Sequence, residues 1–506
     1  MNQKVKIVAM YLPQFHRVKE NDEWWGEGFT EWVAVKNAKS YLEGHNQPRV
    51  PQNQFYYDLL ERKTMEWQAD LMHQYLIDGM CFYHYWFKDG KRILEKPAER
   101  LLQWKEIDMP FCFCWANESW SRTWAKAKSD NVWSTIYEKK QQPGESGILL
   151  EQDYGQEQEW EEHFQYLLPF FQDSRYIRID GKPIFSIYKP NDSIIIFRML
   201  RYWNKRAKDY GMAGIYFIGM ENCCIGTDAV CKRQPYHAIT SYIESHKMSY
   251  DQIRLYPYDE IWERILAQAD LNKDEILCAF VDFDNTPRMG ENGQVMLDAN
   301  PEMFHRYFQI LYQKSMDNNS KILFINAWNE WGEGMYLEPD GRNHTGYLEA
   351  VRDTVLHHEH AECVDVVDKS IELVVKREEM LKKQLFELNR HDKLLEKWLS
   401  LKERRVYFDS YFIKHGYKNI AIYGMGKLGN HLLNELKESE INIVYGIDRS
   451  NKTNSAVHIY NPEQELPRVD AVVITITDQY AEISRMLDRK LDCDMVPIEE
   501  VIDGLQ

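Results

Sequence analysis

Apolar runs alternate with amphipathic stretches through the first 350 or so residues of the chain. Stretches such as RKTMEWQADLMHQYL and EEHFQYLLPFF have the spacing of helices that bury one face. The apolar runs that predict strands are VKIVAMYL (5–12), GMCFYHYWF (79–87), PFCFCWA (110–116), PIFSIY (183–188), GIYFIGM (214–220), ILCAFVDF (276–283) and KILFINAW (321–328), with a weaker one around YHAITSYI (236–243). Strands that alternate with helices predict a parallel sheet. About eight such units in roughly 350 residues predict a (β/α)8 TIM-type barrel with insertions, which we place at residues 1–362.

Several of the predicted strands end in a cluster of aromatic and polar residues. The clusters are YLPQFH, FYHYWF, CWANESW, VDFDNTPR and NAWNEWGEG. In a (β/α)8 barrel the carboxyl ends of the strands meet at one face, where active sites are built. One such cluster would more often be core than site, but five in one chain favour a shared pocket.

Tryptophan marks a change of character near residue 360. Of the 16 tryptophans, 15 precede this point and only Trp398 follows it. Residues 363–416 carry dense mixed charge and leucines at helical spacing, which predicts an amphipathic helical connector. The leucines are Leu381, Leu385, Leu388 and Leu395. Homo-oligomerisation through this connector is a hypothesis that the same spacing raises.

Residues 417–506 predict a small doubly wound, Rossmann-like α/β domain. Its first segment, NIAIYGMGKLGNHLLNEL, has the pattern of a strand, a glycine turn and a helix. Gly424, Gly426 and Gly429 in the turn, with Asp448 at the end of the next strand, match the context of a dinucleotide fingerprint and predict a nucleotide site. The domain is about half the size of a full dinucleotide-binding fold, so tight packing of strand against helix is the alternative explanation.

Charge and composition exclude several kinds of partner. The formal net charge of −17 argues against nucleic acid and against anionic membrane surfaces. No stretch approaches the roughly 20 apolar residues that a membrane span needs. The N-terminal apolar run is too short for a signal peptide, so we expect a cytoplasmic protein with no membrane span.

Cysteines and histidines do not predict a metal site. The nine cysteines form no CxxC pair, which indicates reduced core residues. HHEH (357–360) is better explained as the solvated end of a helix. DFD (282–284) resembles the metal-binding motif of nucleotide-sugar transferases, but its place at a predicted strand end explains it better. We therefore predict no metal, and no cofactor for the barrel.

Two carboxylates in NAWNEWGEG (326–334) have the setting of a glycosidic site. Cleaving an acetal needs one carboxyl to protonate the leaving oxygen and a second to act at the sugar. Glu330 and Glu333 lie three positions apart beside Trp328 and Trp331. Indole walls and a neighbouring carboxylate both raise the pKa of a carboxyl, so the two acids can divide these roles. On spacing alone, two glutamates in the first turn of a helix explain the pair equally well. The preceding strand, the glycines and the tryptophans favour the site.

Motifs along residues 5–350 together resemble one family. In chain order they are MYLPQFH, NDEWWGEGFTEW, GHNQPR, IDGMCFYHYWF, CWANESWSRTW, DGKPIFSIYKP, FDNTPR and NAWNEWGEGMYLEPD. The set resembles the WbsX family, glycosyltransferases encoded among bacterial O-antigen and capsule biosynthesis genes. Through WNEWGEG that family is in turn similar to glycoside hydrolase family 99, the endo-α-mannosidases and endo-mannanases. The resemblance implies a carbohydrate-active enzyme of polysaccharide biosynthesis, with a glycan or an activated sugar as substrate.

The resemblance to family 99 also implies roles for the two glutamates. Glu330 would deprotonate the substrate 2-hydroxyl, and Glu333 would protonate the leaving oxygen and then activate the incoming acceptor. The implied route is retaining and passes through a 1,2-anhydro sugar. This chain has Gly332 where the hydrolases tend to have histidine, a departure that bears on how Glu333 is polarised.

Other aromatic and polar residues near the predicted strand ends are expected to bind the sugar. Indoles cover the apolar faces of sugars, and directional polar groups discriminate hydroxyls. Taken singly, each polar residue is better explained as a satisfied structural group. The expected substrate-binding residues are Tyr11, His16, Trp24, Trp25, His45, Arg49, His84, Tyr85, Trp86, Trp115, Asn117, Glu118, Trp120, Asp284, Asn285, Arg288, Trp328, Asn329 and Trp331.

Three functions are consistent with these residues. Glycosyl transfer at a retaining site is favoured by the WbsX resemblance, and an endo-acting hydrolase of family 99 type by the carboxylate pair. A non-catalytic glycan-binding or scaffold protein is the third. An NAD-dependent oxidoreductase rests on the glycine turn alone.

Overall fold

The computed structural model describes residues 5–121, 148–221, 226–246, 253–271, 275–357, 369–449, 456–476 and 479–505. The predicted boundary at residues 362 and 363 and positions 358–360 of HHEH lie outside these ranges. The chain divides into two compact units, Met1–Glu378 and Glu379–Gln506. Within the described ranges, none of the helices combines the length and the apolar character that a bilayer span needs.

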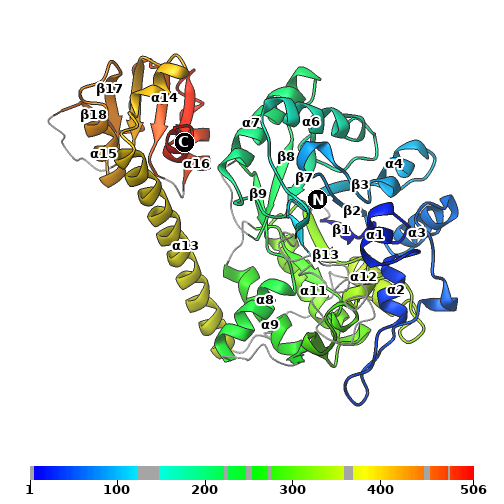
Figure 1. Ribbon diagram of the computed structural model, residues 1–506. Helices are drawn as coiled ribbons and strands as arrows, with labels where there is room; N and C mark the ends of the chain where they lie inside the picture. The colour runs from blue at the N-terminus through cyan, green and yellow to red at the C-terminus, as the bar shows by residue number, and fades with distance from the viewer. Residues whose placement is uncertain are drawn as a thin grey trace, which may run out of the picture. The chain divides into compact units, whose positions relative to one another are not determined.

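Eight parallel strands form a barrel in the first unit (Figure 1). They are β1 (Lys6–Tyr11), β2 (Gly79–His84), β3 (Phe111–Trp115), β7 (Lys182–Ile187), β8 (Tyr216–Met220), β9 (Ala229–Cys231), β11 (Cys278–Phe280) and β13 (Ile322–Asn326). Among these eight strands, each from β1 to β8 pairs with the next barrel strand in chain order. Strand β11 pairs with β13, and β13 pairs with β1. A parallel bridge between Cys231 and Ile276 joins β9 to the segment just before β11, where the Ile276 N–H donates to the Val230 carbonyl at 2.8 Å. The predicted (β/α)8 barrel is confirmed.

Helices surround these strands and bury their outer faces (Figure 1). Both faces of each barrel strand are therefore apolar, which explains the nearly continuous hydrophobic runs of the sequence. The helices are α1 (Lys19–Trp25), α2 (Glu31–Lys36), α3 (Arg62–Gln74), α4 (Lys96–Gln103), α6 (Glu157–Phe171), α7 (Ile194–Asp209), α8 (Tyr236–His246), α9 (Tyr258–Leu271), α10 (Thr286–Met289), α11 (Pro301–Asp317) and α12 (Gly346–His357).

Short elements decorate the barrel between these helices and strands. The strands are β4 (Trp120–Ser121), β5 (Ile148–Leu150), β6 (Arg178–Ile179), β10 (Arg254–Pro257), β12 (Gln294–Leu297), β14 (Asn329–Glu330) and β15 (Met335–Tyr336). The 3-10 turns are η1 (Gln52–Gln54), η2 (Lys88–Gly90), η4 (Gly290–Asn292) and η5 (Trp331–Glu333). The hairpin of β14 and β15 and turn η5 carry the NEWGEG segment.

One predicted strand is wrong. The run around 236–243 forms helix α8, which buries Ala238, Ile239 and Tyr242 at helical spacing on one face. The eighth barrel strand is β9, which lies a few residues earlier. Three residues are too short to give a sequence signal, whereas YHAITSYI is rich in residue types that favour strands.

The second unit is a five-stranded parallel sheet with helices. Its strands run in the order β18 (Ile459–Tyr460), β17 (Asn442–Ile447), β16 (Asn419–Tyr423), β19 (Ala471–Ile474) and β20 (Asp494–Pro497). The strand order reverses between β16 and β19, the first and fourth strands of this unit, which gives a switch point as in doubly wound folds. The helices are α14 (Asp409–Lys414), α15 (Lys427–Glu435), α16 (Tyr480–Leu487) and α17 (Ile498–Asp503).

Helix α13 (Lys369–Glu403) occupies much of the segment predicted as a helical connector, and the division between the two units falls within it. Its later part packs into the core of the second unit through Leu394, Trp398 and Leu401. Homo-oligomerisation through this helix stays a prediction.

The glycine turn of the second unit is held by packing and by a side-chain hydrogen bond. A Cβ atom at Gly429 would lie 2.2 Å from the Gly424 carbonyl oxygen, so α15 approaches the turn closely only because this residue is glycine. The Met425 N–H donates to Asp448 Oδ2 at 2.9 Å. These contacts explain Gly429 and Asp448 without a ligand, and nucleotide binding at this turn stays a prediction.

Two neighbouring glycines of this turn make a matched pair of substitutions. Gly429→Ala forces α15 away from the Gly424 carbonyl, and we expect it to destabilise the second unit by about 1–3 kcal/mol, as overpacking does. Gly426→Ala is the control, because a Cβ there meets nothing within 4 Å. Calorimetry on the full chain measures both. Equal unfolding temperatures for the two variants would contradict the packing role of Gly429.

Candidate active site

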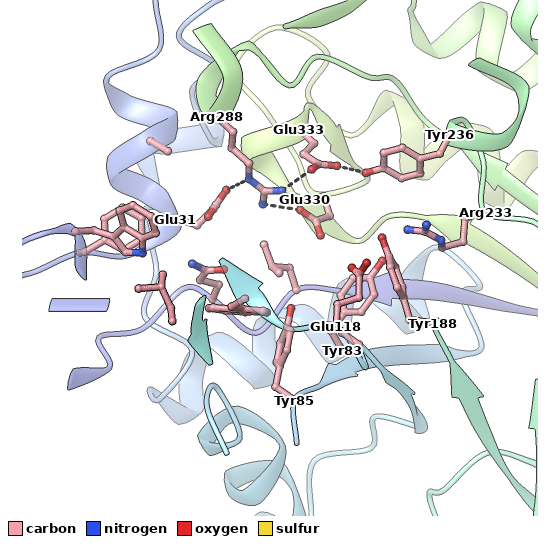
Figure 2. Close-up of a pocket in the computed structure, with 18 residues that line it drawn as sticks. Glu31, Tyr83, Tyr85, Glu118, Tyr188, Arg233, Tyr236, Arg288, Glu330 and Glu333 are labelled. Atoms are coloured by element: carbon pink, nitrogen blue, oxygen red, sulfur yellow. Dashed lines mark hydrogen bonds and ion pairs between the residues drawn. The ribbon is translucent and has the colours of Figure 1, made fainter. Parts of the chain in front are cut away.

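A cavity of about 210 Å³ opens at the carboxyl ends of the barrel strands (Figure 2). Seven of the eight barrel strands supply residues to it, directly or through the segments that follow them. The cavity is lined by Leu12, Gln14, Trp25, Phe29, Glu31, Ala34, Tyr83, Tyr85, Ala116, Glu118, Trp120, Leu149, Tyr188, Arg233, Tyr236, Arg288, Glu330 and Glu333. A concave site with apolar walls and a few convergent polar groups suits a small-molecule or sugar ligand.

One guanidinium joins three carboxylates in this cavity (Figure 2). Arg288 donates from Nε to Glu31 at 2.7 Å, from Nη1 to Glu333 at 2.6 Å and from Nη2 to Glu330 at 2.9 Å. Burial lowers the pKa of Arg288, but the three carboxylate charges outweigh it and the pKa is raised well above its ordinary value. Glu330 and Glu333 therefore share one cation and lie together at one end of the barrel.

Glu330 and Glu333 have different surroundings. Burial raises the pKa of Glu330 to about 8. The positive charge of Arg288 opposes the shift, and the negative charges of Glu333 and Glu31 add to it. Glu333 accepts from Arg288 through one carboxylate oxygen and from the Tyr236 hydroxyl through the other. Two acids in unlike environments are what a division of proton-transfer roles requires.

The turn that carries Glu333 is fixed by residues that the sequence analysis assigned to sugar binding. The Asp284 N–H donates to the Glu333 carbonyl at 2.7 Å, and Arg49 donates to the Gly334 carbonyl at 3.2 Å. Gly334 lies in the left-handed region at φ 67°, where glycine is favoured. His45 contacts Asp284 at 2.8 Å, and Arg49 pairs with Asp282 at 2.9 Å. His45 and Arg49 of GHNQPR, together with Asp282 and Asp284, therefore support the turn from outside the cavity lining, whereas Arg288 at the end of FDNTPR belongs to the lining.

A second buried network lies behind the tryptophans of the same segment. Glu338 accepts hydrogen bonds from Trp331 Nε1 at 2.7 Å, Gln68 at 2.7 Å and the Tyr57 hydroxyl at 2.8 Å. The Tyr11 hydroxyl donates to Gln68 at 2.7 Å. Burial raises the pKa of Glu338 to about 7, and these donors oppose the shift. The network fixes Trp331 from behind and uses Tyr11 structurally.

The wall opposite the carboxylates carries tyrosines and a second arginine. The Arg233 guanidinium lies 3.7 Å from the ring centroid of Tyr188, and its Nε is 3.3 Å from Glu221. Glu118 is paired with Lys189 at the same wall. Figure 2 shows the side chains of Tyr83, Tyr188 and Arg233 across the cavity from Glu330. Aromatic faces and polar groups thus lie on both sides of the space available to a ligand.

Of the predicted site residues, seven line the cavity: Trp25, Tyr85, Glu118, Trp120, Arg288, Glu330 and Glu333. The remaining fourteen do not belong to its lining. They are Tyr11, His16, Trp24, His45, Arg49, His84, Trp86, Trp115, Asn117, Asp284, Asn285, Trp328, Asn329 and Trp331.

Several of these fourteen residues have structural contacts instead. Asn329 accepts from the Leu12 N–H at 2.8 Å and donates to its carbonyl at 3.0 Å, which ties β14 to the end of β1. Asn117 donates to the Lys189 carbonyl at 2.8 Å. His84 contacts His163 at 2.8 Å in the core, and burial lowers the pKa of His84 to about 3.

The remaining predicted residues are placed by packing and local hydrogen bonds. Trp86 stacks on His163, Trp115 donates to the Trp86 carbonyl, and Trp24 packs near Trp120. Asn285 accepts from the Gln294 N–H. His16 and Trp328 are completely buried, and Trp331 stacks on Tyr336.

The cavity also contains polar residues that the sequence analysis did not single out. Glu31 follows the first strand in GFTEW, a motif used above only for resemblance. Tyr83 and Tyr188 were visible within or beside predicted strands. Arg233 and Tyr236 follow β9. Because the eighth strand was predicted at 236–243, neither residue was expected at the carboxyl end of a strand. Among the described residues, no group of three or more His, Cys, Asp or Glu side chains is arranged to hold a metal ion.

Comparison with known proteins identifies relatives of most of the chain. The family model described as Glycosyltransferase WbsX matches residues 7–351. Two proteins named "Uncharacterized protein WxcX", from two strains of Xanthomonas campestris pv. campestris, are 30% and 29% identical over 398 residues. The match covers 73% of this chain and 54% of each relative, so the chain spans about half the length of the curated relatives it matches.

Solved structures show weaker similarity. A glycoside hydrolase-like protein is 14% identical with a TM-score of 0.42, covering 70% of this chain and 94% of that one. The GH99 endo-alpha-mannosidase from Bacteroides thetaiotaomicron is 14% identical with a TM-score of 0.40, covering 71% and 98%. These TM-scores are too low to support an assignment of fold or function. The assignment of the barrel is based on the strand pairing described above.

Replacing Glu330 by glutamine is expected to stabilise the protein at neutral pH. The folded pKa of about 8 lies above the ordinary value of 4.5, so the native state binds the proton more tightly and stability falls as pH rises between these values. Glu330→Gln removes this loss, which we expect to be worth about 1–3 kcal/mol at pH 7 and close to zero at pH 4. Thermal unfolding at both pH values tests it. The control is Glu27→Gln, at a side chain that is 90% exposed. A variant less stable than the native chain at pH 7 would contradict the shift.

Proposed function

Since the chain belongs to the WbsX glycosyltransferase family, we propose that it transfers a glycosyl unit at a retaining site formed by Glu330 and Glu333. The proposed setting is the biosynthesis of a bacterial O-antigen or capsular polysaccharide, with a glycan or an activated sugar as substrate. A cytoplasmic location stays a prediction from the sequence. Because the chain spans about half of its curated relatives, the proposal concerns the chemistry of this site and leaves the acceptor open.

The observation that carries the proposal is the convergence of the two glutamates on one cavity. Both side chains line it, and one guanidinium contacts both. The cavity is at the carboxyl ends of the strands, where the active sites of (β/α)8 enzymes are built. Trp25, Tyr85 and Trp120 supply aromatic surface near them, which suits the apolar faces of a sugar ring.

The division of roles proposed here is the one that the family 99 resemblance implies, and the unlike environments of the two glutamates allow them to take different roles. Glu330 acts as the base for the substrate 2-hydroxyl, because a carboxylate with a raised pKa is a stronger base near neutral pH than an ordinary glutamate. Loss of that proton lets the 2-oxygen attack the anomeric carbon, which forms the 1,2-anhydro sugar and breaks the bond to the leaving oxygen. Glu333 gives a proton to the leaving oxygen.

The second half of the reaction opens the 1,2-anhydro ring. Glu333, now a carboxylate, takes the proton of the acceptor hydroxyl, whose oxygen attacks the anomeric carbon. The 2-oxygen recovers its proton from Glu330. Two inversions at the same carbon give net retention, and both glutamates return to their starting protonation states. Arg288 contacts both carboxylates and balances their charge during the proton transfers.

Hydrolysis by the same site is the second candidate function. The carboxylate pair itself favours it, because water in place of the acceptor completes the same sequence of steps. Transfer and hydrolysis differ only in the molecule that attacks after the first step, which is an acceptor hydroxyl in transfer and water in hydrolysis. The two functions are therefore separated by their products, not by the residues.

Replacing either glutamate is expected to abolish turnover without unfolding the chain. Glu330→Gln and Glu333→Gln each remove one proton-transfer group, which corresponds to a loss of about 10²–10⁴-fold. Product NMR with nucleotide sugars, with lipid-linked sugars plus acceptor, and with oligosaccharides in water alone measures turnover and separates transfer from hydrolysis. Glu27→Gln is the matched control. Sugar binding that persists in both variants, with no turnover in the native chain, would identify a binding protein instead.

The pH profile tests the role of Glu330. As a base with a raised pKa, it becomes competent as it loses its proton, so kcat is expected to rise with pH through a limb near 8. The measurement is initial rate at saturating substrate between pH 5 and about 9.5, with folding checked by circular dichroism. A rate that instead falls through this limb would assign Glu330 the role of the acid.

A further inference from the structure

A side chain at position 332 would have to displace the side chains of Glu31 and Arg288. A Cβ atom built on Gly332 would lie 1.9 Å from Glu31 Oε1 and 2.8 Å from Arg288 Nε. The backbone of Gly332 is inside turn η5 and outside the left-handed region, so space, and not conformation, requires glycine. The carboxylate of Glu31 thus fills the volume that a side chain at 332 would take.

Glu31 is held in this place by the segment that precedes and follows it. It is the first residue of α2, and its N–H donates to the Gln14 carbonyl at 3.1 Å. The next residue, Trp32, packs its ring 5.4 Å from that of Trp331. The Glu31 side chain is 4% exposed and accepts from Arg288 Nε at 2.7 Å. Such a carboxylate is not a solvated surface charge, and α2 is docked directly against turn η5.

The contact with Glu31 determines how Arg288 presents its other nitrogens. A guanidinium is planar and its N–H groups have fixed directions, so engaging Nε fixes where both terminal nitrogens point. In this structure they point at Glu330 and Glu333. Without a partner at Nε, rotation about the side-chain bonds would let Arg288 pair with one of these carboxylates at the expense of the other.

We infer that Glu31 is a positioning residue of the active site, which orients Arg288 between Glu330 and Glu333, and that Gly332 is its obligatory partner. A residue in the first helix pair thus completes a site whose glutamates come from the last barrel strand. The inference deepens the proposed function and its catalytic meaning rests on it, but the geometry and the experiments below do not require turnover.

The groups around Glu330 decide the expected effect on its proton affinity. Arg288, Glu333 and Glu31 are the charged groups that act on it. Three tyrosines also interact with its charge: Tyr83, Tyr85 and Tyr236. Replacing Glu31 by glutamine keeps an oxygen that accepts from Arg288 Nε but removes one negative charge. The pKa of Glu330 should fall for two reasons. One repelling negative charge is lost, and the positive charge of Arg288 is then shared by fewer carboxylates.

The first experiment follows the carboxyl of Glu330 directly. Chains labelled with ¹³C at the glutamate carboxyl are titrated by NMR, and the Glu330 signal is identified by its loss in Glu330→Gln. In Glu31→Gln we expect the titration midpoint of Glu330 to move to lower pH, while Glu27→Gln, an exposed residue four positions earlier, leaves it unchanged. A Glu330 midpoint in Glu31→Gln equal to that of the native chain, with the same unfolding temperature, would overturn the inference.

The second experiment tests the matched pair. Gly332→Ala adds one methyl group and no charge, and we expect it to push the Glu31 carboxylate off Arg288 and to lower the unfolding temperature. In the Glu31→Ala background the same methyl loses its closest contact and meets only the 2.8 Å approach to Arg288 Nε among these groups, so its effect on the unfolding temperature should fall by more than half. Additive effects of the two substitutions would overturn the inference.

These outcomes are distinguishable from failure of the proposed function. If no donor is turned over, the titration and the double-mutant cycle still report on the Glu31–Arg288 contact. If turnover is found but neither measurement changes as expected, the glutamate pair acts without Glu31.

Discussion

The cavity depends on a single cation that is shared by three acids. Three carboxylates brought together out of water repel one another and resist ionisation, and Arg288 makes their proximity tolerable by donating to each of them. The three acids come from widely separated parts of the chain, one before the second barrel strand and two after the last. Their meeting is therefore a property of the closed barrel, whose ends bring the first and last strands together through the pairing of β1 with β13.

Residues of the sequence motifs surround the cluster of Arg288 and its three carboxylates and hold the segments that carry it. GHNQPR and FDNTPR hold the turn after Glu333 by their own ion pairs, and Glu338 with its donors holds Trp331 from behind. The residues that touch the cavity are fewer than the motifs suggest. Much of the polar character of the motifs serves to fix two glutamates in place, which agrees with the general need of active sites for a rigid surrounding shell.

Sequence patterns were sufficient to predict the barrel and seven residues of the cavity lining, Glu330 and Glu333 among them, and insufficient for the other polar residues of the cavity. Seven strands are marked by apolar runs, and five of these runs end in clusters of aromatic and polar residues, of which the NEWGEG turn is one. Strand β9 is only three residues long, and the sequence pattern placed this strand seven residues too late. Arg233 and Tyr236 were therefore not recognised as residues at a strand end. Glu31 carried no spacing signal, because its partner Arg288 is 257 residues away. Buried polar motifs such as His45 with Asp284 look the same in a sequence whether they bind a sugar or each other.

The shortness of β9 has a consequence for the motions of the barrel. It pairs with β8 through only its three residues, and the ring is completed toward β11 by the bridge between Cys231 and Ile276. Few backbone hydrogen bonds mark a segment of low local stability, so this seam is where amide hydrogen exchange by local opening should be fastest among the barrel strands. Arg233 and Tyr236 follow directly after it and both line the cavity. A ligand that contacts these two residues would slow exchange at the seam, and closure of the barrel would be thermodynamically linked to occupancy.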